Sequence, residues 1–342
     1  MKESYWEPEE TEYLYESRYP FDYANCQPRS IYESCSAWSP MAGLIRELSN
    51  LTDIFYACNT RFPPLLLDTL KKFHPACRIH ILPFNLRSLQ TLRSDKYQLD
   101  LVQSPSLYSI RCSFRCPFSV DYTAPNRLNT AAIRTLTSMA PRLKEVYVAY
   151  AHGHVLYELD KAAWKGAEDL EQCFPQHRAS LRTFHLGWHP GTFIEDGLLR
   201  DWSRFVDFDA LRVLRLPAPL RPKGLELLGA YSFPFLKNLV INIDVAYGRD
   251  EPGYEREKTF SRFIDRLKKL CTLEVIGWDD FYLGKHLFNP SCGFALRTLD
   301  LQGHVGHPVW PLPNPFNARL IALTVQRWPL LENLAIRVRR SK

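Results

Sequence analysis

Residues Pro234-Phe235-Leu236-Lys237-Asn238-Leu239-Val240-Ile241 contain a leucine pattern that recurs along the chain. The motif is L-x-x-L-x-L, in which the fourth and sixth positions alternate as they would in a short strand with one buried face. It fits ten places, at Leu51/Ile54/Tyr56, Ala76/Ile79/Ile81, Leu107/Ile110/Cys112, Leu143/Val146/Val148, Leu181/Phe184/Leu186, Leu211/Leu214/Leu216, Leu236/Leu239/Ile241, Leu270/Leu273/Val275, Leu296/Leu299/Leu301 and Leu331/Leu334/Ile336.

Three further regularities support the repeat. The second motif position is basic in half of the units, at Lys144, Arg182, Arg212, Lys237 and Arg297. Proline, which cannot continue a helix, stands one or two residues before several units, at Pro75, Pro105, Pro141, Pro234 and Pro329. Segments between the motifs carry a helical period, with apolar stripes at Phe193/Ile194/Leu198/Leu199/Trp202/Phe205, Phe260/Phe263/Ile264/Leu267/Leu270 and Leu320/Ile321/Thr324/Val325/Trp328.

Alternation of helix and strand predicts an α/β fold, a leucine-rich-repeat solenoid of about ten repeats. We expect a parallel sheet on the concave face and helices on the convex face. Successive units begin between 25 and 38 residues apart, which is longer and less even than the 20–29 residues of regular repeats. The horseshoe should therefore be irregular. An all-helical solenoid could have this spacing, but it would not place a period-2 strand after each proline.

Composition and charge divide the chain into two parts. With 46% hydrophobic and 23% charged residues, the sequence is in the range of globular proteins. Residues 1–40 hold three basic and eight acidic residues, a net charge of −5. Because the whole chain has a net charge of +6, residues 41–342 have a net charge of +11. We expect residues 1–40 to be an acidic, aromatic segment, a cap or partly disordered, and residues 41–342 to be the repeat domain.

Several classes of partner and compartment are disfavoured. A surplus of +11 over some three hundred residues is too dilute to indicate nucleic acid, which requires a concentrated stripe of Lys and Arg. No run of apolar residues is long enough for a membrane helix, and the N-terminus does not resemble a secretory signal. We expect a cytoplasmic or nuclear protein. Nine cysteines without a C-x-x-C pair indicate reduced thiols.

Signatures of catalysis are also missing from the sequence. It has no G-x-S-x-G, no phosphate-binding glycine loop, no G-x-G-x-x-G and no H-E-x-x-H. We therefore expect no enzyme, no cofactor and no metal. One alternative stays open: an enzyme or small-ligand-binding protein that uses loops around His154, His189 and Asp279.

Strand geometry predicts a binding surface instead. The residue between the two core positions of each strand should point away from the helices, at Phe55, His80, Arg111, Tyr147, His185, Arg215, Val240, Glu274, Asp300 and Ala335. Trp188 and Trp278 follow two of the strands. Aromatic and charged groups in order along an arc suit a protein partner. The predicted partner-binding residues are Arg111, Tyr147, His185, Trp188, Arg215, Glu274, Trp278 and Asp300.

The sequence also resembles a known family. Four segments carry the likeness: Leu44-Ile45-Arg46-Glu47-Leu48-Ser49-Asn50-Leu51-Thr52-Asp53, Tyr56-Ala57-Cys58, Phe62-Pro63-Pro64 and His74-Pro75-Ala76-Cys77-Arg78-Ile79-His80-Ile81. They are similar to the start of the repeat region in fungal F-box/leucine-rich-repeat-like proteins, and the resemblance covers about residues 31–342. In that family the repeats hold a substrate, and a preceding F-box docks the Skp adaptor of a cullin ubiquitin ligase.

One departure from the family limits what the resemblance implies. Residues 1–40 have no Leu-Pro pair followed by an acidic residue and an Ile/Leu-rich run. The F-box is therefore missing, divergent or truncated. The resemblance implies a non-enzymatic recognition scaffold that binds a protein substrate on its concave face. Binding of the Skp adaptor and a cullin would require an F-box upstream.

Overall fold

A computed structural model of the chain contains one sheet of ten strands, and all of its paired strands are parallel. The structure describes residues 35–58, 62–82, 84, 100–116, 133–152, 177–187, 194, 196–220, 222–243, 253–278, 295–303 and 328–337. The strands lie side by side in the order of the sequence, from β1 to β10. The predicted α/β class and the parallel sheet are thus confirmed.

The strands occupy the ten predicted places. They are β1 (Asp53–Tyr56), β2 (Arg78–Ile81), β3 (Leu107–Cys116), β4 (Glu145–His152), β5 (Thr183–Gly187), β6 (Val213–Pro219), β7 (Asn238–Asn242), β8 (Thr272–Trp278), β9 (Thr298–Gly303) and β10 (Asn333–Arg337).

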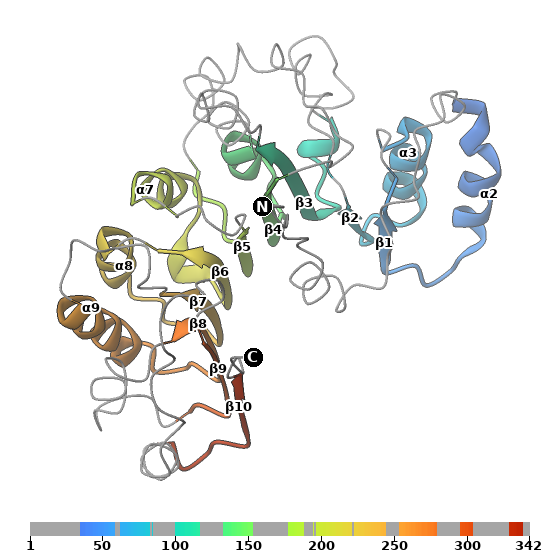
Figure 1. Ribbon diagram of the computed structural model, residues 1–342. Coiled ribbons are helices and arrows are strands. Elements are labelled where there is room, and N and C mark those ends of the chain that lie inside the picture. The colour runs from blue at the N-terminus through green and yellow to red at the C-terminus, as the bar shows by residue number, and fades with distance from the viewer. Residues whose placement is uncertain are drawn as a thin grey trace, which may run out of the picture.

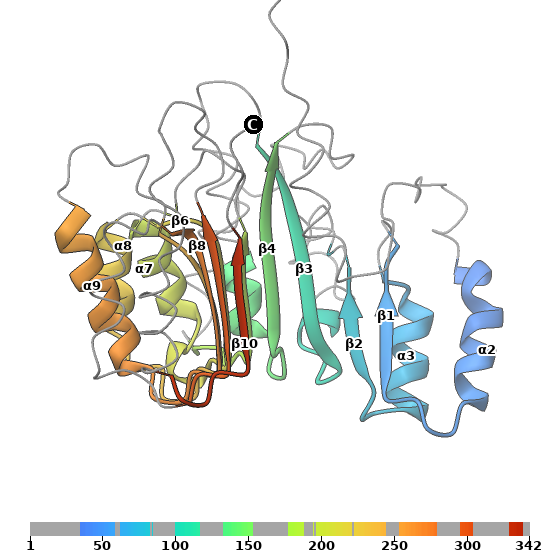
Figure 2. The same cartoon turned by 60° about the horizontal axis from the view of Figure 1, so that its bottom comes forward.

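Helices cover one side of this sheet. They are α2 (Ser39–Glu47), α3 (Pro64–Phe73), a helix at residues 133–139, α7 (Asp196–Phe205), α8 (Pro222–Gly229) and α9 (Gly253–Arg266), with short 3₁₀ turns η3 (Cys35–Trp38) and η5 (Phe208–Ala210). Figure 1 shows the strands along the inside of an arc and the helices on its outer side. Figure 2 shows that the strands run in one direction, so that their amino ends share one edge of the sheet. We call the sheet surface away from the helices the inner face.

The repeated apolar positions form the core between the sheet and the helices. From β3 to β9, all three apolar positions of every motif are at most 3% exposed. The two helical stripes that the structure describes behave in the same way, because Leu199, Trp202, Phe260 and Phe263 are all buried. Each such side chain stabilises the fold by about 1.5–3 kcal/mol. Trp328 of the third stripe is also buried, whereas residues 320–327 lie outside the described residues.

Two core assignments were wrong, both near an end of the sheet. Ala76 is exposed, and Cys77 takes the buried place beside it. Leu334 is 36% exposed. It lies on β10, which has a neighbouring strand on one side only, so its side chain loses the packing that a strand on the other side would supply.

A shift in register separates the first two strands from the others. Ile79 pairs with Leu107 and His80 pairs with Ser109, so Tyr108 is an extra residue in β3. Consequently Ile110 lies beside Ile81 rather than beside Ile79. The expected single row of inner-face residues is therefore two rows, because Phe55 and His80 align with Ser109 and not with Arg111.

Among the helices that the structure describes, none has both the length and the apolar character needed to cross a bilayer.

Candidate functional site

One row of side chains crosses the inner face from β3 to β9. Strand pairing aligns each residue with the next, in the order Arg111, Tyr147, His185, Arg215, Val240, Glu274 and Asp300. We call these seven residues the inner row. All of the predicted partner-binding residues except the two tryptophans belong to it. The alternation of buried and inner-face positions along each strand places them there.

The β3–β6 half of the inner row is cationic around a neutral histidine. Burial, followed by the charges of Arg215 and Arg111, lowers the pKa of His185 to about 3. The imidazole is therefore uncharged at neutral pH. The Tyr147 ring lies 5.8 Å from it, centroid to centroid. The histidine therefore adds no third positive charge beside the two guanidinium groups.

Gly187 gives the His185 ring its space. A Cβ atom at residue 187 would lie 3.1 Å from His185 Nε2 and 3.6 Å from the Cβ of Ala149. The imidazole therefore extends along the strand over the glycine. Alanine at residue 187 would displace the ring by a few tenths of an ångström.

The β8–β9 half of the inner row is acidic. One oxygen of the Glu274 carboxylate accepts a hydrogen bond from Gln302 Nε2 at 2.7 Å, and the other lies 3.9 Å from an Arg215 nitrogen. Asp300 lies beside Glu274 on β9 and is half-buried. Val240, which separates the two halves, is buried. The inner row is therefore electrically polarised, with a cationic end and an anionic end.

Several other predicted positions cannot be placed in this site. Trp188, His154, His189 and Asp279 lie outside the described residues. Trp278 ends β8 and pairs with Gly303, but its side chain is not among those described.

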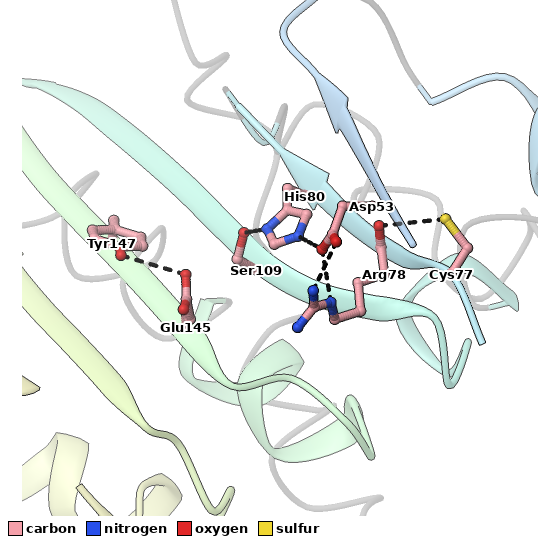
Figure 3. Close-up of polar contacts among 7 residues, drawn as sticks. All are labelled: Asp53, Cys77, Arg78, His80, Ser109, Glu145 and Tyr147. Atoms are coloured by element: carbon pink, nitrogen blue, oxygen red, sulfur yellow. Dashed lines mark hydrogen bonds and ion pairs between the residues drawn. The ribbon is translucent and has the colours of Figure 1, made fainter. Parts of the chain in front are cut away.

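A second polar cluster, which sequence reasoning missed, joins β1, β2 and β3 (Figure 3). His80 Nδ1 lies 2.7 Å from the Ser109 hydroxyl, and His80 Nε2 lies 3.0 Å from an Asp53 carboxylate oxygen. Because the carboxylate can only accept, Nε2 donates to Asp53. Arg78 contacts both oxygens of the same carboxylate at 2.7 Å. Three adjacent strands are thus connected through one imidazole.

Charge assistance is strong in this cluster. Hydrogen bonds from Arg78, followed by those from His80 and Thr52, hold the pKa of Asp53 well below its ordinary value, against an opposing effect of burial. Phe55 stacks on the His80 ring with a centroid distance of 4.3 Å, and the residue is 59% exposed. Phe55 therefore shields one face of the imidazole from water.

Serine, histidine and aspartate in hydrogen-bonding order are also the groups of a nucleophilic relay. The burial of this cluster favours a structural role, because Ser109 is 2% exposed and His80 is 7% exposed. A substrate carbonyl has no open path to the hydroxyl, because Ser109 is almost completely buried. The cluster instead fixes the alignment of β2 with β3 where Tyr108 is inserted.

The buried thiols of the described ranges are unreactive. Burial raises the pKa of Cys77 to about 11 and also raises that of Cys112. Both thiols are therefore protonated at neutral pH. In the described part of the chain, no three His, Cys, Asp or Glu residues come together in a way that could hold a metal ion.

Comparisons with family models and with curated proteins gave no match. Function is therefore inferred from the inner row and from the sequence.

Proposed function

We propose that the chain is a leucine-rich-repeat solenoid of about ten units that acts as a non-enzymatic scaffold for protein recognition. Its counterpart would be the substrate-binding part of an F-box-type ubiquitin ligase receptor, working in the cytoplasm or the nucleus. The partner would bind the inner face between Arg111 and Asp300.

The inner row is the observation that carries this proposal. Six of its seven residues are charged or aromatic, and strand pairing holds them in line. At about 4.8 Å per strand, the row is about 29 Å long. Tyr and Arg are the residue types that contribute most often to binding hot spots. A linear, polarised row of this length suits a protein segment better than a small molecule.

Separation of charge along the inner row would give the partner an orientation. A bound segment would place acidic groups over Arg111 and Arg215 and basic groups over Glu274 and Asp300. The reverse orientation would bring like charges together, which is costly at an interface. We therefore expect the surface to select both the partner and its direction.

A combined variant, Tyr147→Ala, Arg215→Glu and Asp300→Lys, tests the inner row. We expect affinity capture with this variant to lose the specific partners of the wild-type protein, with binding weakened at least about a hundredfold for each of them. The matched control is Glu226→Lys with Arg262→Glu, two exposed charges on α8 and α9. The control should retain the same partners. An unchanged partner list for the combined variant would reject the inner row as the binding surface.

The ligase role has a separate test, because it depends on the resemblance of residues 44–81 to F-box/leucine-rich-repeat-like proteins. With an F-box upstream of the repeats, capture should recover a Skp adaptor and a cullin along with the substrate. Recovery of partners that depend on the inner row without either ligase component would leave a recognition scaffold and reject the ligase role.

A further inference from the structure

The amino-terminal edge of the sheet carries a row of basic residues. Each one is the second residue of a leucine motif, and the row consists of Lys144, Arg182, Arg212, Lys237 and Arg297. We call these five residues the basic edge. Four of them are exposed, and Lys144 is half-buried. Between Lys237 and Arg297 the equivalent position is Cys271, so no carboxylate interrupts the row from β4 to β9.

Backbone hydrogen bonds hold these residues beside one another. The amide of Arg182 donates to the carbonyl of Lys144 at 2.7 Å, and that of Arg212 donates to Arg182 at 2.9 Å. The amide of Lys237 donates to Arg212 at 2.8 Å, and Cys271 continues the chain of bonds to Arg297. At about 4.8 Å per strand, the five cations extend over about 24 Å.

The closeness of these positive charges affects the pKa of Lys144. Partial burial lowers its pKa, and the charge of Arg182 lowers it further. The Lys144 ammonium group donates to the carbonyl of Ser180 at 2.9 Å, which provides a neutral acceptor but no opposite charge. Of the five side chains, Arg297 has a carboxylate partner, Glu332, at 2.8 Å. An anion along the edge would therefore relieve repulsion that folding creates.

Neighbouring residues at the same edge strengthen its positive charge. The turns that lead into β4 through β8 add four further basic residues against two acidic ones, namely Arg142, Arg178, Lys268 and Lys269 against Asp207 and Asp209. The Asp209 carboxylate accepts a hydrogen bond from Ser232. The structure thus concentrates a surplus that looked dilute along the sequence.

In its described part, this edge is poor in a feature that single-stranded nucleic acid uses. Such ligands need exposed aromatic rings on which bases stack, in addition to cations. In the described turns of this edge the exposed large aromatic side chain is Phe235, and the Lys269 ammonium group already lies 4.8 Å from its ring centroid. An acidic polypeptide makes no such demand, because its carboxylates need only the cations.

The chain itself supplies an acidic polypeptide of suitable size. Residues 1–34 contain eight acidic and three basic residues, a net charge of −5. Thirty-four residues can span at most about 110 Å, which exceeds the length of the basic edge several times. The covalent connection to η3 also gives the segment an effective concentration in the millimolar range, which a free ligand rarely reaches.

We propose that the acidic residues 1–34 of this chain bind the basic edge formed by Lys144, Arg182, Arg212, Lys237 and Arg297. The contact is electrostatic and intramolecular. It lies at the amino-terminal edge of the sheet, whereas the inner row lies on the inner face. A competing acidic partner can reach the basic edge only by displacing this segment.

Carbodiimide cross-linking of the full-length protein tests the contact, because this reagent joins a carboxylate only to an amine that touches it. Peptide mass spectrometry should find amide bonds from the carboxylates between Glu3 and Glu33 to Lys144 and Lys237. Their yield should fall at least about fivefold in 0.5 M NaCl, where charges are screened within about 4 Å. Arg182→Glu with Arg212→Glu should lower the yield by a similar factor, because the variant reverses two charges of the basic edge. Both reactive lysines are retained, so a lower yield would report weaker contact and not a lost amine.

The matched control is Lys223→Glu with Arg262→Glu, which makes the same charge change on exposed positions of α8 and α9. This control should leave the yield unchanged. Absence of the Lys144 and Lys237 cross-links, or a yield that Arg182→Glu with Arg212→Glu does not lower, would overturn the proposal. So would cross-links that join ¹⁵N-labelled to unlabelled molecules in a mixed sample, because the contact would then be between chains.

A twenty-residue uridine oligonucleotide serves as the competing ligand. We expect weak binding, with a Kd above about 100 µM at 0.15 M salt, a strength typical of non-specific electrostatic contacts. Submicromolar binding that Arg182→Glu with Arg212→Glu abolishes would assign the basic edge to nucleic acid and overturn the proposal.

Discussion

The Asp53 carboxylate connects β1 to β2 through hydrogen bonds from Arg78 and His80 and through its ion pair with Arg78. Because its pKa is lowered in the folded protein, the charged form stabilises the fold at every pH above the ordinary value of 3.8. That contribution is lost as the pH falls from there toward the lowered value.

Replacing Asp53 by Asn should therefore destabilise the protein at neutral pH. We expect a loss of about 1 kcal/mol at pH 7, because the partner arginine is exposed and water screens the pair. The difference between variant and wild type should shrink steadily between pH 3.8 and pH 2. Urea unfolding at pH 7, 4 and 2.5 measures it. Asp68→Asn, an exposed change on α3, should alter stability by less than about 0.5 kcal/mol.

Phe233 has a backbone conformation that a bulky residue rarely adopts. Its φ angle is 42°, although its ring is buried against Phe208 and Phe263 at centroid distances of 5.9 Å. Packing therefore maintains a strained backbone.

We expect Phe233→Ala to lower the free energy of unfolding by about 3–4 kcal/mol through the lost aromatic contacts. Phe233→Gly should be no worse than Phe233→Ala, because glycine accepts positive φ without strain. The same pair of changes at Phe263, in helix α9, should show the reverse order, with Gly about 1 kcal/mol worse than Ala. Thermal or urea unfolding of the four variants measures both orders of stability. A Phe233→Gly variant clearly less stable than Phe233→Ala would contradict backbone strain at residue 233.

At the scale of elements, the sequence predicts the strands well because one signal is repeated many times. Leu, Val and Ile at the fourth and sixth positions of each motif mark a buried strand face, and the preceding proline marks the end of a helix. The α9 stripe of Phe260, Phe263 and Ile264 is equally clear. The inner row follows from the same alternation, so the sequence alone is enough to place Tyr147, His185 and Arg215 together.

Alignment between strands is harder to predict, and β3 shows why. Side chains alternate with a period of two, so a slip of two residues buries the same face as before. The motif starting at Leu107 is compatible with both alignments, and nothing local favours the one that inserts Tyr108. For this reason the cluster of Asp53, His80 and Ser109 could not be predicted. Its members are far apart in sequence, and Ser109 lies beside His80 only in the shifted alignment.

At the scale of the whole molecule, each described strand pairs only with the strands next to it in sequence. Cooperativity in such an arrangement depends on interfaces between adjacent units, so the ends should open more easily than the middle. β10 is the clearer case, because Leu334 is partly exposed whereas Leu214 and Leu239 are fully buried.

Hydrogen exchange should reveal this difference. We expect backbone amides of β10 to exchange at least about tenfold faster than those of β6 and β7 at neutral pH. Mass spectrometry of peptic fragments can compare the three strands in one experiment, with β6 and β7 as internal references. Equal protection across all three strands would mean that the sheet opens as a single unit.

The insertion of Tyr108 limits the ligand that can lie across the inner face. Passing from β2 to β3, a ligand would have to step two residues along the strands, about 6.6 Å, to stay on aligned side chains. From Arg111 to Ala335 the alignment is continuous over eight strands, a path of about 34 Å. A straight, extended peptide of about ten residues would fill that path and end at β3, whereas a longer one would have to bend there.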